Sequence, residues 1–174
     1  AVGAGVSAAR IGERVITDGW LRDPADPTNM NKTGYFGSEC DGGFAEYTVT
    51  LADNAIAISS DLSDAELATF SCSYSTAEGM LTRARVDSSD TVLVTGASGG
   101  VGGALVQLAK YRGARVVSLA SEQKHADVAA LGADRLLPRA PDDLRAALGD
   151  EAITVVADIV GGAYWPSLID VLER

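Results

Sequence analysis

Residues 91–112 carry the clearest structural signal in the chain and read TVLVTGASGGVGGALVQLAKYR. The run 91–95 is short, apolar and rich in β-branched residues, which predicts a buried strand. Farther on, Val101, Leu105 and Leu108 recur at helical spacing and predict a helix. The glycines at this junction are Gly96, Gly99, Gly100 and Gly102. The stretch therefore predicts a strand, a tight glycine turn and a helix in direct succession.

This succession is the context in which proteins bind the pyrophosphate of a dinucleotide. Glycine lets the backbone approach a phosphate without a Cβ in the way, and the helix N-terminus offers free N–H groups and a partial positive charge. The pattern departs from G-x-G-x-x-G at its first position, where Ala97 suits a turn that needs no positive φ. A glycine-rich turn that binds nothing is the alternative. The predicted cofactor contacts in the turn are Gly96, Ala97, Ser98, Gly99, Gly100, Val101 and Gly102.

The composition is that of a globular protein whose net charge does not favour binding to nucleic acid. The chain has 174 residues, of which 47% are apolar, and a net charge of −10. An acidic chain repels nucleic acid and anionic membranes, so neither is an expected partner, and no apolar run is long enough to cross a bilayer. The two cysteines, Cys40 and Cys72, are too few for a disulfide framework, which makes a reducing cytoplasm the expected location.

Residues 1–60 predict short strands joined by loops. Strands are expected at 14–17, 44–50 and 55–58. Residues 18–43 have the Asp, Pro, Asn and Gly content of a long irregular loop, and a loop of that length is usually functional or mobile. This part of the chain is therefore expected to be β-rich.

Residues 61–84 predict two connecting helices. The first begins at the capping box Ser63-Asp64-Ala65-Glu66 and carries Leu67 and Phe70 on its buried face. The small polar residues of 72–76 are expected to interrupt it before a second helix. The boundary between the β-rich part and the nucleotide-binding part is expected along these helices.

Residues 85–174 predict alternating strands and helices. After the glycine turn, strands are expected at 115–120, 135–137 and 153–160. Three helices are expected between and after them, capped by Ser121, opened by Pro141 and opened by Pro166. Apolar strands that alternate with helices indicate a parallel sheet covered on both faces, here with about four strands where a full dinucleotide fold has six.

Three motifs together resemble the medium-chain dehydrogenases/reductases: GSECDGGFAEYTV (37–49), CSYST (72–76) and VTGASGGVGGALVQLAK (94–110). Within that superfamily the chain is similar to zinc-type alcohol dehydrogenases and quinone oxidoreductases. Family members are longer at both ends, so the natural protein is expected to extend beyond the sequence given. The resemblance implies an α/β fold in which part of a β-rich GroES-like domain (1–60) precedes the first half of a doubly wound parallel Rossmann sheet (85–174).

The resemblance also implies roles for two residues. Cys72 stands where zinc-dependent relatives have a cysteine ligand of the catalytic metal, and Thr76 matches a residue near the nicotinamide. Thiolate is a good zinc ligand, and a catalytic zinc keeps one position open for a substrate oxygen. A small buried cysteine without a metal is the alternative reading of Cys72. Cys40 is alone in the loop 18–43, so a four-cysteine structural zinc site is not expected.

The choice between NADP and NAD depends on the end of the strand at 115–120. NAD-binding folds usually place an acidic residue there to hold the ribose hydroxyls. Ser121 and Lys124 offer a hydroxyl and a cation to a 2′-phosphate, which predicts NADP, while Glu122 keeps NAD as the alternative. An ordinary exposed helix charge is the other reading of Lys124. Val160, near the carboxyl end of the last predicted strand, is a further predicted cofactor contact, with Asp158 beside it.

Three functions follow from these features. The first is an NADP-linked, zinc-dependent oxidoreductase acting on a small alcohol, aldehyde or ketone. The second is a zinc-free enone or quinone reductase that uses NADPH. The third is a nucleotide-binding module without catalysis. In each case a homo-oligomer is expected, and no turnover is expected from the 174-residue stretch alone.

Overall fold

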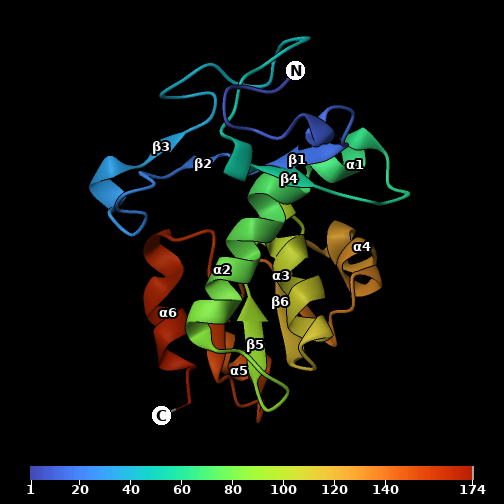
Figure 1. The fold of residues 1–174 in the computed structure, drawn as a ribbon. Helices are drawn as coiled ribbons and strands as arrows, with labels where there is room; N and C mark the ends of the chain where they lie inside the picture. Colours follow the sequence, from blue (N-terminus) through green and yellow to red (C-terminus); the bar gives the residue numbers. More distant parts are fainter. Residues whose placement is uncertain (174) are drawn as a thin grey trace. The chain divides into compact units, whose positions relative to one another are not determined.

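The computed structural model describes residues 1–173, which fall into two compact units, Ala1–Ser71 and a second that begins at Cys72. Figure 1 traces the chain through both. A π-helical turn, Phe70–Tyr74, contains the boundary. No helix among the described residues is long and apolar enough to cross a lipid bilayer.

The second unit is built on a parallel sheet of four strands in the order β7-β6-β5-β8. The central strand β5 is buried on both faces, because Val92 and Val94 enter one hydrophobic core and Leu93 enters the other. The strand order reverses between β5 and β8, which makes that edge a topological switch point. The strands are β5 (Thr91–Val94), β6 (Arg115–Ala120), β7 (Arg135–Pro138) and β8 (Val155–Ala157).

Helices cover both faces of this sheet. Leu81, Leu105 and Val128 place α2, α3 and α4 over one core, and Leu148 and Leu168 place α5 and α6 over the other. Figure 1 shows α2 and α3 side by side along the sheet. The predicted doubly wound α/β architecture is therefore confirmed. The helices are α2 (Ser75–Ala84), α3 (Gly100–Tyr111), α4 (His125–Ala130), α5 (Leu144–Leu148) and α6 (Trp165–Asp170).

The first unit contains two small antiparallel strand pairs, three 3-10 turns and one short α-helix. Strand β1 (Val15–Thr17) pairs with β4 (Ala55–Ala57), and β2 (Trp20–Leu21) pairs with β3 (Gly34–Tyr35). The helix α1 (Asp64–Ala68) begins at the predicted capping box. There the Glu66 N–H donates to the Ser63 hydroxyl at 3.3 Å, and the Ser63 N–H donates to the Glu66 carboxylate at 2.8 Å.

Two expectations for the first unit are wrong. Residues 44–50 form no strand, because no neighbouring strand pairs with them among the described residues of this unit, and a strand needs a ladder to exist. Residues 18–43 are not wholly irregular, since they contain β2 and β3. Side chains add to the backbone pairing: the rings of Trp20 and Tyr35 stack with centroids 6.3 Å apart, and the Arg22 guanidinium lies 4.4 Å from the Trp20 ring centroid.

Several boundaries in the second unit also differ from the prediction. Helix α5 begins after Asp143, whose carboxylate accepts the Ala146 N–H at 2.9 Å, and Pro141 lies outside it. Ser121 makes no side-chain cap, because a 3-10 turn closed by its backbone carbonyl precedes α4. The polar stretch before α2 is a π-helical turn, so it continues the helical path without a break. Strand β8 is shorter than predicted because the chain turns at Asp158.

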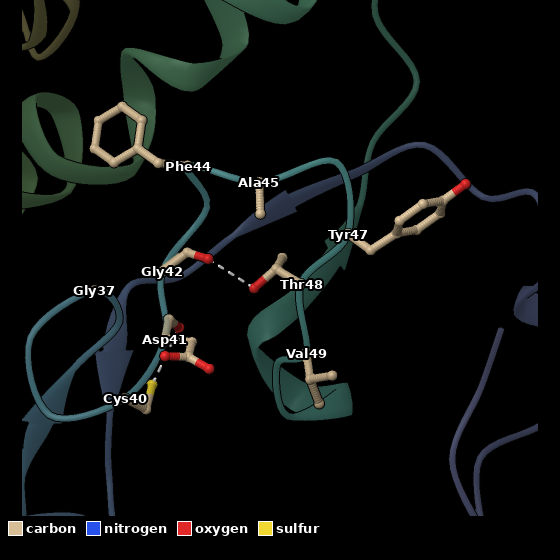
Figure 2. Close-up of a pocket in the computed structure, with 9 residues that line it drawn as sticks. All are labelled: Gly37, Cys40, Asp41, Gly42, Phe44, Ala45, Tyr47, Thr48 and Val49. Atoms are coloured by element: carbon tan, nitrogen blue, oxygen red, sulfur yellow. Dashed lines mark hydrogen bonds between the residues drawn. The ribbon is translucent and has the colours of Figure 1, made fainter.

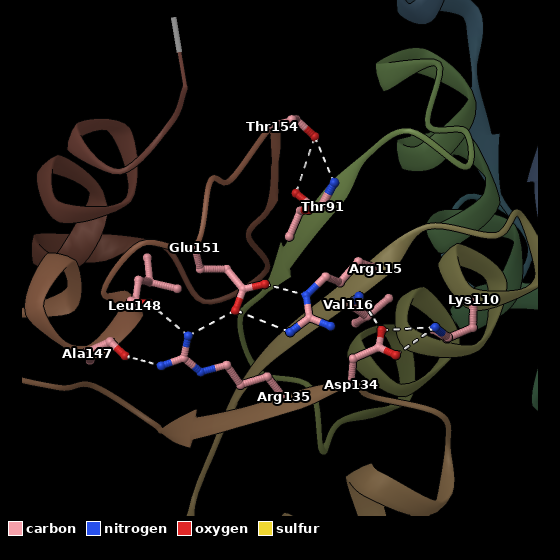
Figure 3. A network of polar contacts seen from close by, with 10 residues as sticks. All are labelled: Thr91, Lys110, Arg115, Val116, Asp134, Arg135, Ala147, Leu148, Glu151 and Thr154. Carbon is pink, nitrogen blue, oxygen red and sulfur yellow. Dashed lines mark hydrogen bonds and ion pairs between the residues drawn. The ribbon is translucent and has the colours of Figure 1, made fainter.

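A network of ion pairs joins the amino ends of the strands β6 and β7 (Figure 3). Arg115 and Arg135, the first residues of these strands, both bond to the carboxylate of Glu151, the latter at 2.9 Å. Beside them, the Lys110 Nζ lies 2.9 Å from each oxygen of Asp134. These contacts are at the opposite end of the sheet from the glycine turn.

Candidate nucleotide-binding site

The glycine turn follows the carboxyl end of β5 and leads directly into α3. Gly96 has φ +59°, in the left-handed region that favours glycine, and its carbonyl accepts the Gly99 N–H at 3.0 Å. Ala97 is fully buried with an ordinary φ, so its methyl group fills the core beneath the turn. This explains why alanine is suited to the first position of the pattern: the required positive φ belongs to the residue before it.

Two glycines of the turn lie at close approaches, and at Gly102 the approach is to backbone and requires glycine. A Cβ on Gly102 would lie 2.1 Å from the Gly96 carbonyl oxygen, a distance that no structure tolerates. A Cβ on Gly100 would lie 2.7 Å from the Ser73 hydroxyl. The backbone of α3 therefore packs directly against the turn, and a hydroxyl from the π-helical turn lies against its first residue.

The N-terminus of α3 is left without a side-chain cap. Its N-cap is Gly99, which has no side chain to offer, and the Gly103 N–H is the first to bond back, to the Gly99 carbonyl at 2.8 Å. Ser98, Gly99 and Gly100 are exposed, while Val101 is half-buried against the core. A twelve-residue helix with uncapped amides at an accessible N-terminus can hold a phosphate group.

The segment that contains Cys72 and Thr76 passes close to this helix. The Gln107 amide of α3 donates to the Tyr74 hydroxyl at 2.9 Å, which fixes the π-helical turn beside α3. Cys72 is exposed, as is Thr76 in the first turn of α2. The sequence prediction missed Ser73, since its position against Gly100 depends on a contact between residues far apart in the chain.

At the carboxyl end of β8, the Asp158 carboxylate accepts four hydrogen bonds. Its donors are the Thr95 hydroxyl, the N–H groups of Val160 and Gly161, and the Trp165 indole. Burial raises the pKa of this carboxyl, but the hydrogen bonds outweigh burial and lower the pKa below its ordinary value. Val160, a predicted cofactor contact, is exposed in the loop that these bonds hold.

The residues after β6 lie on the surface. Lys124 Nζ pairs with the Asp127 carboxylate at 3.0 Å, and both side chains are more than half exposed. The ring of His125 lies 3.1 Å from the Ala120 carbonyl oxygen, which caps the end of the strand. Ser121 is exposed as well. The predicted 2′-phosphate contacts are thus accessible, although the cation already has an acidic partner.

The donor set for zinc is incomplete within this chain. A catalytic zinc needs three protein ligands, and no group of three His, Cys, Asp or Glu side chains gathers anywhere in residues 1–173. Cys40 and Cys72 both carry free thiols. Cys72 could supply one ligand at most, so the described residues do not fit a zinc ion by themselves.

A separate hollow of about 650 Å³ lies in the first unit (Figure 2). It is formed by residues 37–49, with Cys40 on one side and the hydroxyl of Thr48 bonded to the Gly42 carbonyl at 2.9 Å. The rings of Phe44 and Tyr47 extend away from its centre. The hollow contains none of the predicted site residues, and its only acidic side chain is Asp41.

Comparison with known proteins gives a family match for most of the second unit. A family model described as zinc-binding dehydrogenase matches residues 100–174. The acryloyl-coenzyme A reductase of Metallosphaera sedula is 33% identical to the chain over 92% of the chain and 50% of that protein. The chain therefore spans about half the length of the relatives that it matches.

Solved structures agree in fold over almost the whole chain. A Sinorhizobium meliloti 1021 protein assigned to the alcohol dehydrogenases is 46% identical, with a TM-score of 0.89 over 99% of this chain and 49% of its own. An alcohol dehydrogenase of Escherichia coli CFT073, complexed with NADH, is 25% identical with the same TM-score over 99% of this chain and 55% of its own.

Proposed function

Because the chain belongs to the medium-chain dehydrogenase/reductase superfamily, we propose that its protein is an NAD(P)-dependent oxidoreductase that interconverts an alcohol and a carbonyl compound. The observation that carries this proposal is the glycine turn at the switch point of a parallel sheet, where Gly102 allows α3 to approach the backbone of Gly96. A dinucleotide bound there would supply the nicotinamide that accepts or donates hydride.

The residues of the chain take distinct roles in this proposal. The uncapped amides of α3 hold the diphosphate, and Val160 forms one wall of the crevice. Thr76 lies near the nicotinamide, and Cys72 contributes one ligand to a zinc site whose other ligands lie elsewhere in the protein. Residues 1–60 belong to a GroES-like catalytic domain, residues 61–84 connect it to the nucleotide-binding domain, and the protein is a homo-oligomer.

The preferred nucleotide is NADP. Ser121 and Lys124 follow the strand whose carboxyl end meets the adenosine ribose in this fold, and both are accessible. Calorimetric titration of the chain with NADPH and with NADH tests both the binding of a dinucleotide and the preference for NADP. Binding of neither nucleotide contradicts the oxidoreductase assignment, and much tighter binding of NADH contradicts only the NADP preference.

A zinc-free reductase of a conjugated carbon–carbon double bond is the second candidate. It is favoured by the similarity to an acryloyl-coenzyme A reductase, which is 33% identical. Metal analysis of the active protein separates the two candidates. Near-stoichiometric zinc that is lost together with activity on chelation excludes the zinc-free reductase. Full activity on an enone without zinc excludes the zinc-dependent enzyme.

The third candidate, a nucleotide-binding module without catalysis, is tested on the 174-residue chain itself. We expect this chain to bind nucleotide and to show no turnover with alcohols or aldehydes, because its residues do not complete a metal site. Measurable dehydrogenase activity of the chain alone would contradict that expectation.

A further inference from the structure

Asp158 is the most connected polar side chain at the carboxyl end of the sheet. One carboxylate oxygen, Oδ1, accepts from the Thr95 hydroxyl and from the Val160 N–H at 3.1 Å. The other, Oδ2, accepts from the Gly161 N–H at 3.0 Å and from the Trp165 indole at 2.7 Å. With two donors on each oxygen, the carboxylate has no acceptor site left for a substrate or a proton relay.

These bonds tie together the two strands that flank the switch point. Thr95 follows the last residue of β5, and its hydroxyl oxygen also accepts the Ile159 N–H at 3.1 Å. Asp158 follows the last residue of β8, 63 residues farther along the chain. The side chains of both residues point into the same junction, so the end of β5 and the loop after β8 are held as one piece.

The loop held in this way forms the wall that faces the glycine turn. A Cβ on Gly96 would lie 3.1 Å from the Val160 side chain and 3.2 Å from that of Ile159, which places both apolar groups directly against the turn. The loop then reverses through Gly161 and Gly162, with φ values of +66° and +83°. Glycines adopt such φ values without strain and leave the backbone many conformations, and the bond from the Gly161 N–H to Asp158 restricts them.

We propose that Asp158 is a positioning residue for dinucleotide binding: its carboxylate sets the distance between the loop 159–161 and the glycine turn, and so the width of the crevice that receives the dinucleotide. This inference rests on the proposed function. Asp158 acts through Thr95 and the loop backbone, without touching the ligand. Asparagine is the informative replacement, because it keeps the size of the side chain but offers one acceptor oxygen where the carboxylate offers two.

Asp134 provides a matched control within the same sheet. Its carboxylate also accepts a backbone N–H, from Val116 at 2.7 Å, and forms an ion pair with Lys110. These contacts lie at the amino end of the strands (Figure 3), whereas Asp158 lies at the carboxyl end. Asp158→Asn and Asp134→Asn thus both remove a carboxylate that accepts a backbone N–H. Only the first should alter the crevice.

The test compares the wild-type chain with both variants by calorimetric titration with NADPH and NADH, and by the indole N–H resonance of Trp165 in a ¹⁵N-labelled sample. Folding is checked by circular dichroism. We expect Asp158→Asn to weaken binding by about tenfold, the factor for one hydrogen bond to a charged group, and to move the Trp165 indole resonance. Asp134→Asn should leave both unchanged. Trp165→Phe assigns the resonance, since the chain has only two tryptophans.

Each result has a defined consequence. If the wild type binds nucleotide and Asp158→Asn binds equally well, or if Asp134→Asn loses as much affinity, the positioning role is refuted while the proposed function stands. If the wild type binds neither nucleotide, both fall. Should Asp158→Asn fail to fold, Thr95→Val removes the hydroxyl that donates to Asp158 and accepts from the Ile159 N–H, in a side chain of the same shape. An affinity reduced about threefold then supports the role, and an unchanged affinity overturns it.

Discussion

The substitution Gly102→Ala tests the feature on which the nucleotide-binding assignment depends. The added Cβ would lie 2.1 Å from the Gly96 carbonyl oxygen and 2.8 Å from the Ala97 Cα. All of its close neighbours are backbone atoms, so no rotamer change can relieve the clash. To reach an ordinary contact of about 3.4 Å, the first turn of α3 must move away from the glycine turn.

The expected cost follows from two opposing effects. Overpacking a core position costs about 1–3 kcal/mol, and a backbone clash belongs at the upper end of that range. Alanine regains about 1 kcal/mol over glycine inside a helix. Gly102→Ala should therefore lower the free energy of unfolding by about 2 kcal/mol. Because the displaced amides no longer meet the diphosphate, nucleotide binding should weaken by about tenfold or more.

Two other helical glycines serve as controls. A Cβ on Gly103 would lie 3.1 Å from the flexible end of the Leu131 side chain, which can rotate away, and 3.7 Å from the Ala97 carbonyl oxygen, an ordinary contact. A Cβ on Gly79 in α2 would meet nothing within 4 Å. Gly79→Ala should stabilise the chain by about 1 kcal/mol, and Gly103→Ala should have little effect, since gain and strain offset each other.

Urea titrations followed by circular dichroism give the stability of all three variants, and calorimetry with NADPH gives their affinity. The reasoning is refuted if Gly102→Ala is as stable as Gly103→Ala and binds nucleotide like the wild type. That result would mean that α3 does not need to lie this close to the turn. A loss of affinity in Gly103→Ala equal to that of Gly102→Ala would contradict the assignment of the effect to one contact.

Three further predictions concern the same unit. Ser118→Ala should raise the free energy of unfolding by about 1 kcal/mol in a urea titration, because the Ser118 hydroxyl is fully buried without a hydrogen-bond partner among the described residues; a lower stability contradicts this. Burial raises the pKa of Asp134, but bonds from Val116 and Lys110 outweigh it and lower the pKa below its ordinary value of 3.8. The ionised form is therefore favoured in the folded state, so the free energy of unfolding should fall as the pH drops below about 3.8. In Asp134→Asn this fall should be less steep. If stability depends on pH in the variant as it does in the wild type, Asp134 is not its source. Lys124→Gln should weaken NADPH binding by about three- to tenfold and leave NADH binding unchanged in calorimetry; equal loss for both nucleotides contradicts a 2′-phosphate contact.

The sequence could predict the parts of the fold that depend on local signals. The apolar run of β5 and the helical periodicity of α3 are readable from neighbouring residues, and the capping box at Ser63 places a helix start within one residue. The strand predicted at 44–50 failed for a different reason. Its residues have strand propensity, but a strand also needs a partner, which propensity does not supply.

Contacts between distant residues account for most of what the sequence could not predict. Asp158 could be placed near the carboxyl end of a strand, but its bond to Thr95 joins residues 63 apart. Ser73 is similar, because its place against Gly100 is set by the packing of α2 on α3. The start of α5 was misplaced for a local reason: Asp143 is a stronger cap than the position of Pro141 suggests.

The two ends of the parallel sheet carry different kinds of polar interaction. Those at the amino end stabilise the fold, and those at the carboxyl end shape the proposed binding site. At the amino end, Glu151 joins the first residues of β6 and β7 through ion pairs. At the carboxyl end, the glycine turn removes side chains from the crevice, and Asp158 compensates by fixing the loop that the missing side chains cannot support. Such an anchor restricts a loop that contains the consecutive glycines Gly161 and Gly162, whose backbone would otherwise have many conformations. The anchor and the glycines therefore act as one device, and a substitution in either should reduce nucleotide affinity by more than its effect on folding predicts.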